Sequence, residues 1–191
     1  MTDEDFITRR IVKLIQNDIS YYAMHTNYDV LGMAELAGKV MNMKDAEILE
    51  VTAEGRYRGS KMSRKGFGRV SDLEIPMTLR ECCEDVKDAF HLGTVKVFGN
   101  LEDKVKRIAI CPGSGKSVIQ AALDKHADVL ITGDIGHHEG IDAVAQGLAI
   151  IDGGHYGIEH IFIEDMRQYL EKNLKDVEVI SAPIIHPFLL V

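Results

Sequence analysis

Apolar residues recur along the chain at two spacings, one typical of helices and one typical of strands, and together they predict an α/β protein. Helical spacing predicts helices near the N-terminus, over 33–43, from Thr78 onward and over about 156–174. Thr2 is the expected N-cap of the first helix. Its buried face is expected to consist of Ile7, Ile11, Leu14 and Ile15.

Short apolar runs predict the strands. They lie at 19–25, 46–53, 95–98, 107–111, 129–132 and 148–152. The segments between the last three runs have helical spacing, which is typical of βαβ units. We therefore expect mainly parallel or mixed sheets with flanking helices. A glycine-rich hairpin-like loop is predicted over 54–68, and the apolar C-terminal stretch 183–191 is expected to pack against the body.

Composition and charge narrow the classes of function. The 191 residues are 46% apolar and 27% charged, which suits one sizeable core and a single domain over 1–191. The net charge of −8 would repel a phosphate backbone, so nucleic-acid binding is disfavoured. The basic run Arg56–Arg69 is a local exception, and we interpret it as a solvated hairpin.

The cysteines and the N-terminus indicate the compartment. The three cysteines include an adjacent pair and form no Cys-x-x-Cys motif, so a disulfide framework is not expected. Cys82 and Cys83 fall on the apolar stripe of the helix that starts at Thr78, where Glu81 completes a capping box. The first ten residues are polar and acidic, unlike a signal peptide, and no apolar run approaches the ~20 residues needed to cross a membrane. We expect a cytoplasmic protein.

The segment from Asp152 to Glu159 combines a strand end with a helix start, where open α/β sheets bind ligands. On a helical wheel, His155 and Glu159 share the inward stripe with Ile158 and Phe162. A carboxylate that faces a core is costly unless it is paired or bound to a metal. The pair therefore indicates either a site for zinc, iron or manganese, or a buried histidine–glutamate hydrogen bond.

Two other strand-end segments carry polar residues of the same kind. His25-Thr-Asn-Tyr-Asp29 follows the apolar run 19–25, and it fits either a metal-binding loop or ordinary turn chemistry. Thr132–Gly140 contains His137 and His138, which could be ligands, supporting groups, a proton-transfer pair or exposed loop residues.

The loop Cys111–Ser117 resembles a phosphate-binding P-loop only in part. That motif needs a glycine five residues before the glycine of Gly-Lys-Ser, and the position holds Ile110. The simpler interpretation is a tight turn that lets helix and strand pack closely.

Taken in order, these segments resemble the ring-forming dinuclear-metal-centre proteins known as GTP cyclohydrolase I type 2 homologues. The resemblance covers essentially the whole chain and rests on His25–Asp29, Gly66–Val70, Gly113–Gly115, Thr132–Asp134 with His138, and His155 with Glu159. It implies two similar lobes that face a central metal cleft, and a homohexamer that is a trimer of dimers. It further implies two divalent ions (Zn, Fe or Mn), with Asp29, His155 and Glu159 as ligands. It also places His25 and His138 in the cleft, where they are the candidate catalytic residues for moving protons.

The chain also departs from the family pattern. The family's metal site uses a His-His-Pro motif in an N-terminal region that would lie before Met1, so the chain is expected to be N-terminally truncated relative to the family. The inserted middle domain of some members is absent, since 91–101 runs directly into the next strand. Three hypotheses follow: a metal-dependent hydrolase (cyclohydrolase-like or phosphoester) acting on a nucleotide-type substrate, a non-catalytic hexameric scaffold that binds metal or a partner, and, least favoured, a nucleic-acid-binding protein.

Overall fold

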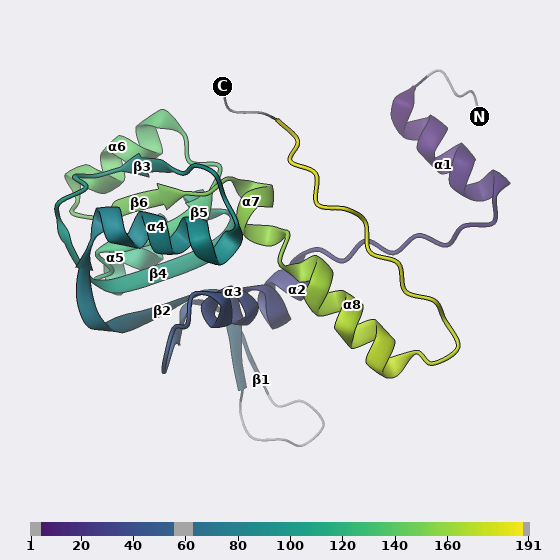
Figure 1. Cartoon of the computed structure of the whole chain (residues 1–191), viewed down its shortest axis with the longest axis horizontal. Coiled ribbons are helices and arrows are strands. Elements are labelled where there is room, and N and C mark those ends of the chain that lie inside the picture. The colour runs from purple at the N-terminus through teal and green to yellow at the C-terminus, as the bar shows by residue number, and fades with distance from the viewer. Residues whose placement is uncertain (1–4, 56–62, 189–191) are drawn as a thin grey trace.

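A six-stranded mixed sheet forms the centre of the molecule, with strand order β1-β2-β4-β5-β6-β3 (Figure 1). The computed structural model describes residues 5–55 and 63–188. β4, β5 and β6 are parallel, whereas β1–β2, β2–β4 and β6–β3 pair antiparallel. The strands are β1 (Glu47–Gly55), β2 (Ser63–Thr78), β3 (Lys96–Phe98), β4 (Lys104–Ser114), β5 (Val129–Gly133) and β6 (Ala149–Asp152).

This architecture confirms the predicted mixed α/β fold with flanking helices. Within the two described ranges there is one sheet, so the second of the two similar lobes that the resemblance implied is not found there. The helical elements are α1 (Phe6–Gln16), α2 (Thr26–Tyr28), the π-helix η1 (Asp29–Met33), α3 (Ala34–Val40), α4 (Leu79–Phe90), the 3-10 helix η2 (Gly115–Val118), α5 (Ile119–Asp124), α6 (His137–Ala145), α7 (His155–Glu159) and α8 (Phe162–Asn173).

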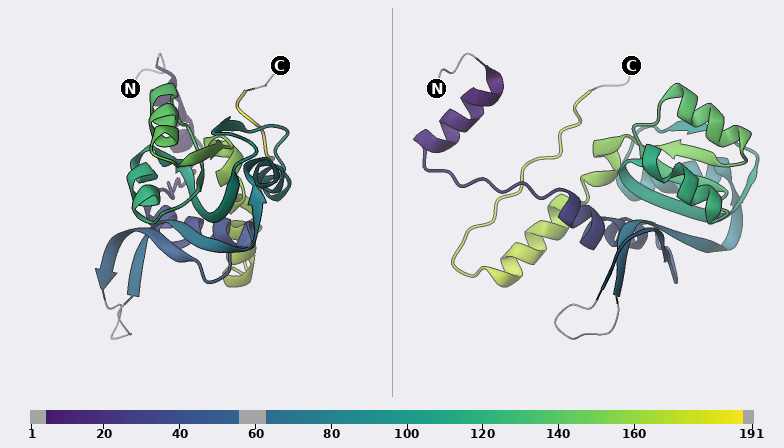
Figure 2. Two further views of the ribbon diagram at one scale, coloured as in Figure 1. Left: turned by 90° about the vertical axis from the view of Figure 1, so that its left-hand side faces the viewer. Right: turned by 180° about the vertical axis from the view of Figure 1, so that it is seen from behind.

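Helices cover both faces of the sheet, and each face has its own apolar cluster. On one face α4 packs against alternate residues of the parallel strands, among them Ile108, Ile131 and Ile151. On the other face α5 and α6 pack against the intervening residues, among them Leu130 and Ile150. The view from behind in Figure 2 shows α5 and α6 on this second face. Because the strands are buried on both faces, they are apolar at nearly every position.

The prediction for α4 is confirmed in detail. Thr78 accepts a hydrogen bond from the Glu81 N–H, and the Glu81 carboxylate accepts one from the Thr78 N–H, which completes the capping box. Cys82 and Cys83 are buried on the packed face, and both are free thiols, as is the buried Cys111.

The N-terminal arm, residues 5–25, corrects two predictions. α1 has Asp5 as its N-cap, and the predicted buried face is exposed: Ile7, Ile11 and Ile15 keep 57%, 44% and 67% of their surface. The run 19–25 was expected to be a strand, but it is an exposed segment that pairs with no strand in the described ranges. Figures 1 and 2 show α1 lying away from the sheet, and α1 has no buried residue.

The helix predicted over 33–43 begins earlier than expected. The segment 26–40 is helical throughout, as α2, η1 and α3, so His25–Asp29 is a helix start and not a loop. The hairpin-like loop predicted over 54–68 is shorter, since β1 runs to Gly55 and β2 begins at Ser63. Residues 56–62 of that loop, and with them much of the basic run, lie outside the described residues.

The C-terminal part also differs from the prediction. The helix expected over 156–174 is broken at His160–Ile161 into α7 and α8, and α8 has no buried residue. The part of the tail that the structure describes, up to residue 188, is exposed, with Ile185 at 69% and Phe188 at 64%. In the described part of the chain, no helix has the length and apolar character that a membrane crossing requires.

Candidate metal site

The carboxyl ends of the three parallel strands meet at one edge of the sheet, where the candidate residues gather. β4 leads into Gly113, β5 ends beside Asp134, and β6 is followed by the loop that starts α7 at His155. This is the edge at which open α/β sheets bind their ligands. The strand topology therefore gathers the candidate residues at one edge of the sheet.

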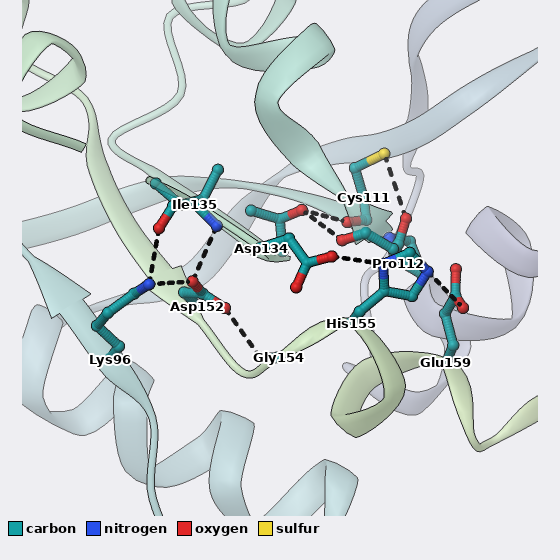
Figure 3. A network of polar contacts seen from close by, with 11 residues as sticks. Lys96, Cys111, Pro112, Asp134, Ile135, Asp152, Gly154, His155 and Glu159 are labelled. Carbon is teal, nitrogen blue, oxygen red and sulfur yellow. Dashed lines mark hydrogen bonds and ion pairs between the residues drawn. The ribbon is translucent and has the colours of Figure 1, made fainter. Parts of the chain in front are cut away.

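His155 lies between two carboxylates. Its Nδ1 is 2.8 Å from Asp134 Oδ2, and its Nε2 is 3.2 Å from Glu159 Oε2, one helical turn later (Figure 3). The His155 side chain is about half exposed and the Glu159 side chain is 26% exposed. The pair predicted from the helical wheel is thus in contact, although it faces an open edge of the sheet and not the core.

Asp29 and His25, which come from the helical segment at α2 and η1, lie beside His155 and Glu159. A small cavity of about 80 Å³ is lined by His25, Asp29, His155 and Glu159, together with the apolar side chains of Met24, Met33 and Phe162. Tyr28 of α2 also lines the cavity and connects α2 to α8. Its hydroxyl donates to Asp165 Oδ2 at 2.5 Å, and its ring contacts Phe162. The structure therefore brings all three predicted ligands and His25 to one cavity.

Glycines leave room for these side chains at the end of β4. Gly113 has φ +81°, and a Cβ there would lie 2.6 Å from Glu159 Oε1. A Cβ on Gly115 would lie 2.0 Å from Thr132 Oγ1, a hydroxyl that donates to the Cys111 carbonyl oxygen at 2.7 Å. The segment predicted to be a tight turn between strand and helix is instead the end of β4, which runs to Ser114, followed directly by η2, and its Gly115 lies against Thr132 of β5.

Carboxylates predominate among the charged groups of the site. Burial raises the pKa of Asp29 above its ordinary value, and the facing His25 and His155 oppose this shift. Burial likewise raises the pKa of Glu159, with His155 opposing the shift and Asp29 adding to it. Burial lowers the pKa of His155, but the hydrogen bond to Asp134 and the surrounding carboxylates outweigh it, so the net shift is upward. Half-buried carboxylates that repel one another are stabilised by a cation.

The side chains do not form a closed metal cage by themselves. In residues 5–55 and 63–188, no three His, Cys, Asp or Glu side chains are gathered closely enough to hold an ion. The donor types nevertheless suit a divalent metal, because two carboxylates and an imidazole face one cavity. The set fits one side of a metal site that further ligands would complete.

His138, the other histidine predicted to line the cleft, lies elsewhere. It is exposed in the first turn of α6, with its ring centroid 5.3 Å from that of His137. It is not among the residues that line the cavity at Asp29 or the larger one on the Asp134 side of His155. Its assignment to the cleft stays a prediction.

Asp134 is the site residue that the sequence did not single out. It belongs to the segment Thr132-Gly-Asp134, but nothing in that pattern showed that its carboxylate would contact His155. Its backbone has φ +57°, a left-handed conformation that aspartate tolerates better than most residues. An aspartate directly after a buried strand, one strand away from a candidate ligand, was the available signal.

Comparisons with known proteins agree with this fold. Residues 1–187 match the family described as Duf34/NIF3 (NGG1p interacting factor 3). A "GTP cyclohydrolase 1 type 2 homolog" of Clostridium acetobutylicum is 30% identical over 187 residues, which cover 97% of this chain and 67% of the relative. A Lactococcus lactis protein of the same name is 37% identical over 168 residues, which cover 85% of this chain and 59% of the relative. The chain thus spans about three fifths to two thirds of these relatives.

Solved structures share the fold. A Bacillus cereus protein related to NIF3 superposes with a TM-score of 0.89 at 21% identity, over 100% of this chain and 78% of that one. A hypothetical protein of Staphylococcus aureus gives 0.79 at 29% identity, over 95% and 72%. Reduced HcgD from Methanocaldococcus jannaschii gives 0.71 at 27% identity, over 91% and 65%. The family resemblance expected from the motifs is confirmed: the chain belongs to the Duf34/NIF3 family.

Proposed function

We propose that this chain supplies one side of a dinuclear divalent-metal centre, with Asp29, His155 and Glu159 as ligands. The observation that carries the proposal is the single cavity that these side chains share, at which two carboxylates with raised pKa values face one another. Removing water from like charges is unfavourable, and a divalent cation would relieve the repulsion. Zinc, iron and manganese are the metals that this donor set suits.

Each residue would have a separate task. Asp29 and Glu159 would provide anionic oxygen ligands, and His155 would provide Nε2. Asp134 would accept the Nδ1 proton of His155, which fixes the tautomer that leaves the Nε2 lone pair free for a ligand bond. Ions bound here would lower the pKa of a water molecule and polarise a substrate oxygen. His25, whose Nδ1 is 2.9 Å from Thr26 Oγ1, would move a proton through Nε2.

The reaction that we propose is a metal-dependent hydrolysis, cyclohydrolase-like or of a phosphoester, on a nucleotide-type substrate. The name printed for the Clostridium and Lactococcus relatives supports the cyclohydrolase type, and the position at the carboxyl edge of parallel strands suits a nucleotide ligand. Because the chain spans only part of these relatives, further ligands would come from sequence outside it or from another chain.

Metal analysis tests the binding half of the proposal. The protein, stripped with a chelator, is dialysed against Zn²⁺, Mn²⁺ or Fe²⁺ and its bound metal is measured by mass spectrometry. His155→Ala and Glu159→Gln should each lower the metal content, whereas His137→Ala and Glu171→Gln, which make the same changes outside the cavity, should leave it unchanged. Equal loss in both pairs would contradict the assignment.

Turnover tests the catalytic half. The metal-loaded protein is assayed with GTP and with simple phosphoesters, and Asp29→Asn and His25→Gln should each reduce the rate. Asp142→Asn, at an exposed position of α6 outside the cavity, is the matched control. An absence of turnover with every metal and substrate would remove the hydrolase proposal and leave metal binding standing.

A hexameric scaffold without catalysis is the second candidate, and the exposed apolar surface of the N-terminal arm favours it. Ile7, Ile11 and Ile15 lie on one face of α1, followed by Tyr21 and Tyr22, which are about three quarters exposed. Contiguous exposed apolar side chains mark surfaces that other chains cover. A trimer of dimers with bound metal but no turnover is the expected result for this candidate, measured by light scattering together with metal analysis.

A further inference from the structure

Asp152 is a buried carboxylate that the proposed metal chemistry does not use. It is the last residue of β6 and keeps 6% of its surface. Its Oδ2 accepts a hydrogen bond from the Ile135 N–H at 3.0 Å, and its Oδ1 accepts one from the Gly154 N–H at 2.9 Å. Lys96 lies 2.8 Å from the same Oδ2 and also donates to the Ile135 carbonyl oxygen at 2.7 Å.

The two backbone N–H groups that donate to Asp152 belong to neighbours of Asp134 and His155, the hydrogen-bonded pair of the candidate site. Ile135 directly follows Asp134, and Gly154 directly precedes His155. Figure 3 shows Asp152 between the two loops, with the Asp134–His155 contact on the other side. One side chain therefore joins the loop after β5 to the loop after β6 at the residues next to the Asp134–His155 hydrogen bond.

The loop after β5 contains a backbone conformation that such a restraint would hold. Asp134 has φ +57° and Gly154 has φ +79°, so each loop turns through the left-handed region. For a non-glycine residue such as Asp134, this conformation persists where the surroundings fix it, whereas glycine adopts positive φ freely. The hydrogen bond from Ile135 supplies that restraint next to Asp134.

We propose that Asp152 is a positioning residue for His155: by binding both loops it holds Asp134 against Nδ1, and Lys96 is its counter-ion. This inference deepens the proposed function and rests on His155 being a ligand, but it also makes a claim about the metal-free chain. Groups that orient a metal-binding histidine set its tautomer and ring direction, and losing them weakens metal binding about 10- to 100-fold.

Asp152→Asn is the substitution that tests the two-loop bridge with least change in shape. Asparagine has one acceptor oxygen, so it can bind the Ile135 N–H or the Gly154 N–H, while its NH₂ group faces the other. Asp128→Asn is the matched control. Asp128 precedes β5, at the opposite end of the strand from Asp134, and accepts backbone hydrogen bonds from Lys106 and Arg107 at 2.7 and 2.8 Å.

The first readout is the tautomer of His155 in the metal-free protein, from the imidazole ¹⁵N chemical shifts at alkaline pH, where the ring is neutral. The unchanged protein and Asp128→Asn should show mainly the Nδ1–H form. Asp152→Asn should shift the ring toward a mixture of the two tautomers. An unchanged tautomer in folded Asp152→Asn would overturn the positioning role.

The second readout is Zn²⁺ affinity by calorimetry. Asp152→Asn should weaken binding about tenfold or more, and Asp128→Asn less than about twofold. If Zn²⁺ does not bind the unchanged protein but the tautomer shifts, the positioning role stands and the proposed function fails. If Zn²⁺ binds all three proteins equally and the tautomer is constant, the positioning role fails and the proposed function stands.

Lys96→Met is the second variant, for use if circular dichroism shows Asp152→Asn to be unfolded. The Lys96 side chain is 55% exposed, so its loss is less disruptive, and it removes one of the contacts that hold Ile135. The tautomer should shift in the same direction by a smaller amount. A folded Lys96→Met with the tautomer of the unchanged protein would also count against the inference.

Discussion

α4, which packs on the sheet, and α1, in the N-terminal arm, have the same kind of hydrophobic pattern, but the apolar face of α4 is buried and that of α1 is exposed. In α4 the apolar stripe that includes Val86 and Phe90 is fully buried against the sheet, whereas in α1 the stripe of Ile7, Ile11 and Ile15 faces outward. Both helices are strongly amphipathic. The difference teaches that periodicity shows which face of a helix needs a partner, but not whether that partner lies within the same chain.

The largest expected difference between the two regions is in core substitutions. Phe90→Ala, at a site with no exposed surface, should lower the free energy of unfolding by about 3–5 kcal/mol, measured by urea denaturation. Ile11→Ala in the arm should change it by no more than about 0.5 kcal/mol. A large loss at Ile11 would show that the arm is packed in solution and would remove the contrast.

Helix caps give a smaller and chemically matched comparison. Thr78→Ala removes the capping box of α4 and should cost about 0.5–2 kcal/mol of unfolding free energy. Asp5→Ala removes the acceptor of the Thr8 N–H at the start of α1. It should reduce helical circular dichroism slightly and leave the urea midpoint unchanged, because α1 contributes no buried residue. Equal shifts of the midpoint would contradict this expectation.

The pH dependence of stability should differ between two histidines, His155 at the candidate site and the buried His160 at the end of α7. His155 has a raised pKa in the folded state, so its stabilisation is complete below its ordinary pKa and is lost as the pH rises through the raised value. His160 is buried, which lowers its pKa, and His186 and His91 add to the effect. Its contribution is complete above the ordinary pKa and is lost as the pH falls through the lowered value.

The free energy of unfolding of metal-free variants, measured between pH 5 and pH 8, tests these two opposite pH dependences. His160→Phe should reduce the loss of stability on the acid side, and His155→Gln should reduce the loss on the alkaline side. The same change of slope in both variants would show that the two imidazoles are not in the different environments described above.

The smallest effect on stability is expected for the outward face of α1. The triple change Ile7→Ser, Ile11→Ser and Ile15→Ser should leave the urea midpoint of the sheet almost unchanged. If the arm holds copies together in the proposed ring, the same change should lower the particle mass measured by light scattering. Lys13→Ser with Gln16→Ser, on the polar face, is the control, and an equal fall in mass there would argue against an apolar interface.

The parallel half of the sheet was predictable because each of its strands is buried on both faces. The runs at 107–111, 129–132 and 148–152 are apolar for that reason, and the capping box fixed the start of α4. The run 19–25 has a similar apolar character but lies exposed in the arm, so local pattern alone assigned it wrongly. Strand formation there would need a neighbouring strand, which is a tertiary property.

The candidate site was predictable where one helical turn contains it and not where loops meet in space. His155 and Glu159 are four residues apart, so helical geometry alone brought them together. Asp29 was assigned through the family resemblance, and it lines the same cavity. Asp134 and Asp152 act across separate strands, and their contacts depend on strand order and backbone conformation that the linear pattern does not contain.

Because Asp29–Met33 is a π-helix, the direction in which Asp29 points depends on the number of residues in this segment. Such a turn holds one residue more than an α-turn, and π-turns are frequent at functional sites. α3 is anchored by the buried Ala34 and Ala37, so its rotation is fixed by the core. Deleting one residue between 29 and 34 would rewind the segment as an α-helix and rotate Asp29 by about 100° away from His155. A relative with a shorter segment here would keep the aspartate in an alignment and yet lose it from the cavity.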